Sequence, residues 1–302
     1  MKKISGYLFS VLLSTVLFAQ EPIDVNAYAH KLYGLTTQAY ETENWTRLRH
    51  FSDKLYHEFT HSPFANDALY YLAVSRYHTK DYVKANQLFT DYLKEKGNPK
   101  FYIEALNYKY KVAEALRNGA KVHMFGNKGP KILSGKEYAL EIYNELINSL
   151  PNEEIAAKAM FAKGQLLAEF NDYNEAVDTF EQLIRTFEKQ QLAIESYIEI
   201  QKVYLAQVSP KTQDSDLLDL ARLNIKKFSE AFPSEERIQQ TVEIYNQMLE
   251  VYAEGLYDIG RFFERTKKTE AAKIYYGRIL HSFGSTKYAK LSKQRLVLLT
   301  QK

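Results

Sequence analysis

The chain has 302 residues, of which 45% are hydrophobic, and it contains 12 glycines and 7 prolines. This composition predicts a chain that is folded throughout around a sizeable core. The formal charge of +3 gives no reason to expect nucleic acid as a partner. Because the chain has no cysteine, it has neither a cysteine nucleophile nor a cysteine that could carry a lipid anchor.

The first nineteen residues have the pattern of a secretory signal. A short basic start is followed by the mostly apolar run Tyr7–Val16 and by the small residue Ala19, which a signal peptidase accepts. We therefore predict a signal peptide over residues 1–19 and export to the periplasm. The alternative is an uncleaved membrane anchor, but a spanning helix needs roughly twenty apolar residues, and this run is shorter and broken by hydroxyl side chains.

A fixed spacing of small and aromatic residues recurs in the rest of the chain. The intervals are nine, three and four residues, first in Ala73, Tyr82, Ala85 and Phe89, and again in Gly164, Tyr173, Ala176 and Phe180. This spacing resembles the signature of tetratricopeptide repeats, in which a small residue on the first helix of a pair lets the second helix approach closely. The resemblance implies an all-α, right-handed tetratricopeptide-repeat superhelix that binds other proteins and is not an enzyme.

From residue 25 to residue 302 the apolar residues recur three and four apart, as helices require. We expect about six helix pairs and a C-terminal capping helix, about thirteen helices in all. In the first pair, Ala39, Phe51 and Leu55 fill the small and large positions. The expected segments are Ala27–Tyr40, Trp45–Phe59, Pro63–Lys96, a third pair from Phe101 to Pro151, Glu154–Phe187, Leu192–Gln207, Leu217–Phe232, Glu235–Arg265, a pairing helix through Tyr276, and Thr286–Leu299.

Three segments depart from a regular array. Residues 118–134 are rich in glycine and predict an inserted loop within the third pair. Within Glu235–Arg265, Gly255 could permit a kink, whereas Gly260 falls at the repeat's own spacing before Tyr276 and predicts close helix packing. The last helix would turn lysines and a glutamine toward water and so cap the array, namely Lys287, Lys290, Lys293 and Gln294.

Two segments resemble the BamD/ComL family of outer-membrane assembly proteins. They are Phe59–Ala68, with its Ser-Pro-Phe-Ala junction, and Leu256–Arg265, which leads into the paired residues Ala271 and Ala272. The resemblance implies a periplasmic scaffold whose N-terminal half binds unfolded outer-membrane proteins. It assigns the C-terminal half to the barrel-assembly machinery. Because the chain has no cysteine to be acylated, we expect any association with the outer membrane to be peripheral. The alternative is another periplasmic repeat adaptor, serving envelope polysaccharide, peptidoglycan or secretion machinery.

The first helices of the pairs would line an inner groove that binds the partner. An aromatic residue recurs at one inward position, and charged inward residues such as Lys158 flank it, which would suit an extended peptide. The alternative is that these rings fill gaps within a tight superhelix. The predicted groove residues are Tyr70, Tyr77, Phe161, Tyr257, Arg261 and Glu264.

One motif points to a different class of protein. His57, Glu58 and His61 form an H-E-x-x-H sequence, which on a helix can bind zinc and supply a general base. Here Ser62 and Pro63 follow at once and end the helix, so we favour surface histidines at a repeat junction over a zinc hydrolase. We predict no catalytic residues, no metal and no cofactor.

Overall fold

The computed structural model describes residues 25–94, 97, 99–123, 131–211 and 215–301. These residues form thirteen helices and one two-stranded sheet. The predicted signal peptide, residues 1–19, lies outside the described residues. None of the helices in the described ranges is long and apolar enough to cross a membrane.

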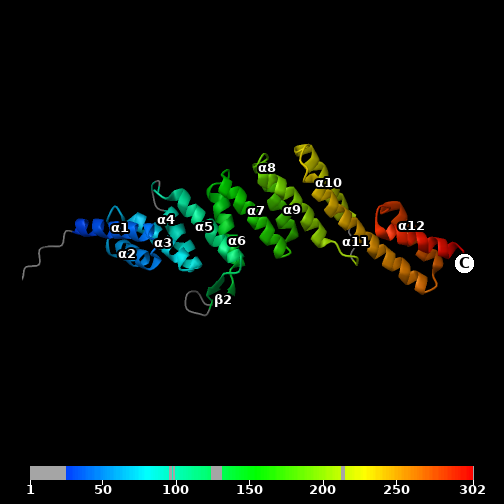
Figure 1. Ribbon diagram of the computed structural model, residues 1–302, viewed down its shortest axis with the longest axis horizontal. Helices are drawn as coiled ribbons and strands as arrows, with labels where there is room; N and C mark the ends of the chain where they lie inside the picture. Colours follow the sequence, from blue (N-terminus) through cyan, green and yellow to red (C-terminus); the bar gives the residue numbers. More distant parts are fainter. Residues whose placement is uncertain (1–24, 95–96, 98, 124–130, 212–214, 302) are drawn as a thin grey trace, which may run out of the picture.

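The helices follow one another along an elongated array (Figure 1). Each packs against its neighbour in sequence, and the described chain runs from one tip of the rod to the other, as its colours show. The predicted all-α array of about six pairs and a capping helix is confirmed. The helices are α1 Val25–Glu41, α2 Trp45–Glu58, α3 Ala65–His78, α4 Tyr82–Lys94, α5 Tyr102–Arg117, α6 Lys136–Ser149, α7 Glu154–Glu169, α8 Tyr173–Thr186, α9 Gln191–Gln207, α10 Ser215–Ala231, α11 Ile238–Arg265, α12 Thr269–Ser282 and α13 Lys287–Thr300.

The recurrent small residues lie where two helices of a pair come closest. Gly164 is buried, and a Cβ atom added there would be 2.7 Å from the ring of Phe180. Gly260 faces the ring of Tyr276 at the same distance, which confirms close packing as the reason for this glycine. In these two pairs the large ring of the second helix fills the space that a side chain on the first would take, and this fixes the register between the two helices.

Among the described residues, the turns of five of the six pairs share one backbone feature. Seven residues after the small position, the chain adopts a positive φ, at Lys80, Asn171 and Lys267. Gly119 takes the same place in the third pair with a φ of 98°. This left-handed residue ends the first helix. After Lys80, Asn171 and Lys267 the second helix begins two residues later, whereas the β1–β2 segment follows Gly119.

The first pair shows that the predicted register was wrong there. Its positive φ lies at Glu43, so the small position is Thr36, which is fully buried, and not Ala39. The corresponding positions of the second helix are Leu48 and Ser52, both buried, in place of Phe51 and Leu55. Sequence spacing failed because Thr36 stands where the second, fourth and sixth pairs have Ala or Gly, and Ser52 stands where they have Phe or Tyr. The buried hydroxyl of Ser52 donates to the carbonyl of Leu48 and is satisfied there.

The segment predicted as a loop between α5 and α6 also contains regular structure. Residues Lys121–His123 (β1) pair antiparallel with Lys131–Ser134 (β2), with an irregularity between Val122 and His123. Val122 is 3% exposed and belongs to the main core. Residues 124–130 lie outside the described residues. The hairpin therefore lies against the array through Val122, while Ile132 and Leu133 of β2 are exposed.

Helix α11 joins two parts of the array. It is a continuous helix of 28 residues that includes Gly255. It packs against α9 and α10 as well as α12 and α13. A separate core, centred on Ala253, Ala272, Tyr276 and Ile279, belongs to the last three helices.

A substitution at Gly260 tests the close contact between α11 and α12. Gly260→Ala places a methyl group 2.7 Å from the buried ring of Tyr276, so we expect a loss of about 1–3 kcal/mol in the free energy of unfolding. Gly34→Ala is the matched control, because that glycine also lies in a helix but has no atom within 4 Å of the added Cβ. It should stabilise the protein by about 0.5–1 kcal/mol. Urea unfolding of both variants measures the difference, and equal stability of the two would refute the packing assigned to Gly260.

Candidate functional site

A groove lies between the first helices of the third and fourth pairs. We call it the α5–α7 groove; it has a volume of about 460 Å³. Its lining is Ile103, Leu106, Asn107, Tyr110, Lys111, Leu150, Glu153, Glu154, Ile155 and Lys158. Residues 103–111 come from α5, whereas 154–158 come from the start of α7 and 150 and 153 from the turn before it.

The floor of the groove is apolar and its edge is charged. Leu106 is buried, Tyr110 and Ile155 are half-buried, and Ile103 is 56% exposed. Isoleucine side chains that are left open to water gain free energy when a partner covers them, by roughly 25 cal/mol for each Å² of apolar surface removed from water. The groove therefore has apolar surface that a partner could bury.

Charges of both signs surround this floor. The ammonium group of Lys158 lies 2.6 Å from a carboxylate oxygen of Glu154, and the two side chains are 50% and 71% exposed. Lys111 and Glu153 are exposed on opposite sides of the groove. Such exposed ion pairs contribute little to stability, but their charges remain available to a partner and can fix its direction in the groove.

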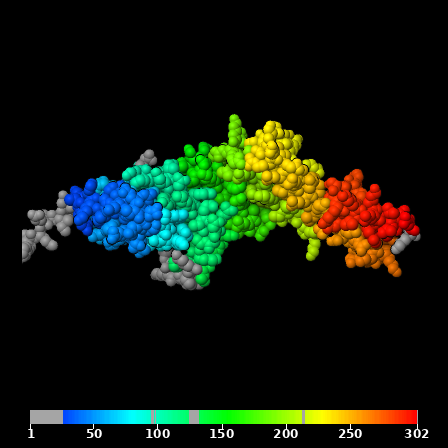
Figure 2. Space-filling model, in the orientation of Figure 1, coloured from blue at the N-terminus to red at the C-terminus, as the bar shows by residue number. Residues whose placement is uncertain are grey.

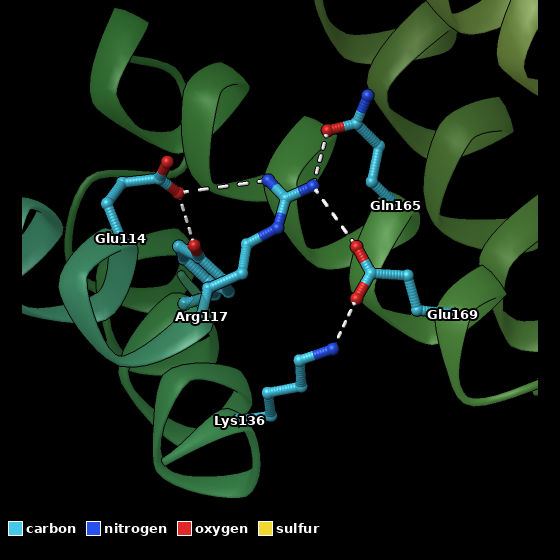
Figure 3. A network of polar contacts seen from close by, with 6 residues as sticks. Glu114, Arg117, Lys136, Gln165 and Glu169 are labelled. Carbon is cyan, nitrogen blue, oxygen red and sulfur yellow. Dashed lines mark hydrogen bonds and ion pairs between the residues drawn. The ribbon is translucent and has the colours of Figure 1, made fainter. Parts of the chain in front are cut away.

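Beyond the groove, a polar network holds α5 and α7 together (Figure 3). Arg117 of α5 donates to the side-chain carbonyl of Gln165 on α7 at 2.8 Å and lies 3.7 Å from a carboxylate oxygen of Glu169. Lys136, at the start of α6, donates to the other oxygen of Glu169 at 2.7 Å. Glu114 completes the network by pairing with Arg117 at 3.9 Å and accepting a hydrogen bond from Tyr143. One guanidinium thus links two helix pairs and fixes the separation of the groove walls.

The tyrosines beside this network stay protonated at neutral pH. Burial, together with the negative charge of Glu114, raises the pKa of Tyr110 to about 12. Burial and the hydrogen bond to Glu114 also raise the pKa of Tyr143. Both hydroxyls are therefore neutral, and the ring of Tyr110 adds an aromatic surface to the groove without a charge.

The structure contradicts the prediction for Tyr70. Its side chain is 2% exposed, and its ring stacks on Phe101 with the centroids 4.4 Å apart. Phe101 comes from the next helix pair, so the superhelix closes over this position and leaves no surface for a partner. Tyr77 is half-buried, and its ring contacts Tyr108 edge-on at 5.3 Å.

The other predicted aromatics also pack within the array. Phe161 is half-buried and meets Phe180 edge-on at 5.7 Å. Tyr257 lies between Tyr276 and Tyr288, with ring centroids 5.6 and 5.5 Å away. These rings share packing with their neighbours and leave only part of their surface free, which agrees with the alternative that they fill gaps between helices.

The two predicted charged residues differ in their availability. Glu264 is 17% exposed and accepts hydrogen bonds from Arg295 of α13 and from the hydroxyl of Tyr276. Arg261 is 40% exposed and lies 3.6 Å from Glu264. Glu264 therefore ties α11 to α12 and α13, and only Arg261 remains open to a partner.

The H-E-x-x-H motif does not present two imidazoles on one helix. Helix α2 ends at Glu58, so His61 lies beyond it in the junction. His57 is 64% exposed and lies 3.7 Å from Asp53, one turn earlier in α2. Within the described ranges, no group of three histidine or acidic side chains could hold a metal ion.

Sequence reasoning missed most of the α5–α7 groove. Of its lining, it placed only Lys158 on the inward face, because the third pair lacks the regular signature that assigns inward positions. The spacing of these residues could have indicated one face of the helix. Ile103, Leu106, Asn107 and Tyr110 are separated by three, one and three residues, the spacing of residues on one side of a helix. Only the structure shows that this side of α5 faces α7.

A family model matches two parts of the chain. The model, described as Tetratricopeptide repeat, matches residues 67–95 and 158–189. These ranges cover most of α3 with α4 and of α7 with α8, the two pairs with the regular signature. No curated protein matches the chain.

Several solved structures resemble the fold. A tetratricopeptide repeat protein from Parabacteroides merdae ATCC 43184 is 14% identical with a TM-score of 0.40, and the match covers 91% of this chain and all of that one. A TPR repeats protein from Bacteroides fragilis NCTC 9343 is 10% identical with a TM-score of 0.42, over 89% and 98% of the two chains. MamA from Desulfovibrio magneticus RS-1 is 13% identical with a TM-score of 0.39, over 69% and 97%. At these identities and scores, the likeness says nothing about partners.

Proposed function

Because the chain is a tetratricopeptide-repeat protein, we propose that it is a periplasmic protein-binding scaffold that assists the assembly of outer-membrane proteins. The observation that carries the binding role is the α5–α7 groove, with its apolar floor and its edge of both charges. Repeat arrays of this kind bind proteins along surfaces that several repeats build together.

The groove suits an extended or helical segment of another protein. Apolar side chains of that segment would cover Ile103 and Ile155, and its charges would meet Lys158 and Glu153 at the edge. The network around Arg117 fixes the groove walls before the partner arrives. A preformed groove binds more tightly because less conformational freedom is lost on binding.

The cellular role rests on two features of the sequence. The pattern of residues 1–19 supports export to the periplasm, and the segments Phe59–Ala68 and Leu256–Arg265 resemble the BamD/ComL family. On this proposal the partners are unfolded outer-membrane proteins and the barrel-assembly machinery. Association with the outer membrane is peripheral, because no cysteine is present to be acylated.

Crosslinking in the cells that produce the protein tests this role. Purification after crosslinking should recover a barrel-assembly protein, and fractionation should place the chain in the periplasm or on the outer membrane, released without detergent. Recovery of a polysaccharide, peptidoglycan or secretion component instead would assign the chain to another envelope machinery. A cytoplasmic location with Met1 retained would contradict export.

A further inference from the structure

The last helix, α13, has the register of the first helix of a repeat pair. In three earlier pairs, an aromatic or leucine residue at the junction precedes the small position by fourteen residues: Phe59 precedes Ala73, Leu150 precedes Gly164, and Phe187 precedes Gln201. Phe283 precedes Val297 by the same interval. Val297 therefore occupies the position against which the second helix of a pair normally packs.

Among the described residues, no helix covers this position in α13. Ala73 and Gln201 are 0% exposed in their pairs, whereas Val297 is 51% exposed. Leu298 and Leu291, on the same outward side of α13, are 50% and 38% exposed. We call this surface the α13 end face and define it by Lys287, Lys290, Leu291, Lys293, Val297 and Leu298.

The α13 end face belongs to a strongly basic part of the chain. Residues 261–302 contain eleven Lys and Arg but only two Asp and Glu, which gives a net charge of +9. The whole chain carries +3, so the remaining residues carry −6. Helix α13 itself has no acidic residue. It packs against α11 and α12 and lies at the tip of the rod (Figure 2).

The register also shows which lysines replace core residues. Lys293 occupies the position of Met160, counted from the same junction residue, and Lys290 occupies that of Ala157. Met160 and Ala157 are buried in one cluster with Leu183 of the covering helix α8. A helix that covers α13 in the same way must therefore offer carboxylates where α8 offers Leu183, because a buried lysine requires an opposite charge.

From this register and charge we infer that the α13 end face docks an acidic amphipathic helix of a partner protein, which completes the seventh helix pair. A second copy of the chain would bring lysines against lysines, which disfavours self-association. On an anionic membrane surface, an amphipathic helix separates its apolar and basic sides. Here Lys290 and Lys293 lie on the same side as Val297, so protein is the better occupant. The inference goes beyond the α5–α7 groove and does not depend on it.

The chain's own covering helix supplies a probe. We would use a fluorescent peptide of residues 173–186 with Phe180→Ala, to make room for Val297, and Leu183→Glu, to meet Lys293. A covalent staple on its solvent-facing side keeps it helical, because so short a peptide is only marginally helical in water. Fluorescence anisotropy against the full chain should show saturable binding. The otherwise identical peptide with Leu183→Lys should bind at least about tenfold more weakly, a difference of about 1.4 kcal/mol.

Charge reversal on the protein distinguishes docking from general attraction. The variant Lys287→Glu/Lys290→Glu/Lys293→Glu should bind the acidic peptide at least about tenfold more weakly than the parent does. It should bind the peptide with Leu183→Lys more tightly than the parent does. The matched control reverses three lysines that are exposed elsewhere, Lys189, Lys211 and Lys226, and should bind as the parent does. The inference is overturned if the acidic peptide does not bind the parent chain, or if the affinity for this peptide falls equally in both triple variants. It is also overturned if the end-face variant abolishes a dimer seen in sedimentation or binding to anionic lipid vesicles.

Discussion

Phe180→Ala is expected to lower the free energy of unfolding by about 3–5 kcal/mol, the usual cost of removing a buried ring. Phe180 is fully buried between Gly164 and Phe161. Because glycine provides no side chain to fill the space, the cavity that remains cannot close by a small shift of α7. The variant should therefore be among the least stable single substitutions in the array.

The same substitution should also change how the array unfolds. In a repeat array each pair is stabilised mainly by its neighbours, so a weak fourth pair should separate the N-terminal pairs from the C-terminal ones. Urea unfolding followed by circular dichroism should show two transitions in place of one. Ile274→Ala is the control, because Ile274 is 58% exposed and its loss should change stability by no more than about 0.5 kcal/mol. A single unshifted transition for Phe180→Ala would refute the packing described for this pair.

Alkaline pH is expected to destabilise the protein steeply. Burial raises the pKa of Tyr204 and that of Tyr276 to about 12, from 10.0. Above pH 10 the unfolded chain loses these protons whereas the folded chain keeps them, so the free energy of unfolding falls between pH 10 and pH 12. Below pH 10 both states are protonated and this contribution does not change. For each of these two tyrosines, the rise in pKa corresponds to a loss of at most about 3 kcal/mol over the window.

A tyrosine-to-phenylalanine pair of variants isolates this effect. Tyr204→Phe removes one titrating group from the core and should make the decline in stability between pH 10 and pH 12 less steep. Tyr138→Phe is the control, because Tyr138 is 41% exposed and its removal should leave the decline as it was. Urea unfolding at several pH values measures both, and an equal pH dependence in parent and Tyr204→Phe would contradict the assigned pKa.

The helix pairs were predictable from the sequence because their packing is local. Gly164 and Phe180 are sixteen residues apart, and their interval alone identifies the closest contact of the pair. The first pair was harder to assign, because Thr36 takes the small position and satisfies its hydroxyl within its own helix by a bond to the carbonyl of Leu32. The β1–β2 hairpin gave no clear signal, since its strands have only three and four residues.

The surfaces were less predictable because they depend on contacts between pairs. The helical periodicity correctly placed Tyr70 on one face of α3, but Phe101 from the following pair covers Tyr70 on that face. The α5–α7 groove likewise depends on the position of α7 relative to α5. A hydrogen bond between Arg117 and Gln165, which are 48 residues apart in the sequence, fixes that position. The net positive charge of residues 261–302 was not evident for another reason. The net charge of the whole chain also includes the net negative charge of the other residues.

The most direct test of the central claim is whether the α5–α7 groove holds the partner. Ile103→Asp/Lys158→Glu changes two exposed groove residues and should leave the melting temperature nearly unchanged, because both side chains are open to water. The control Leu220→Asp/Lys226→Glu makes the same changes on α10, where both side chains are also exposed. After crosslinking in cells, recovery of partner proteins should fall at least about tenfold for the groove variant and stay at the parental level for the control. Equal recovery with both variants would contradict the groove as the binding surface.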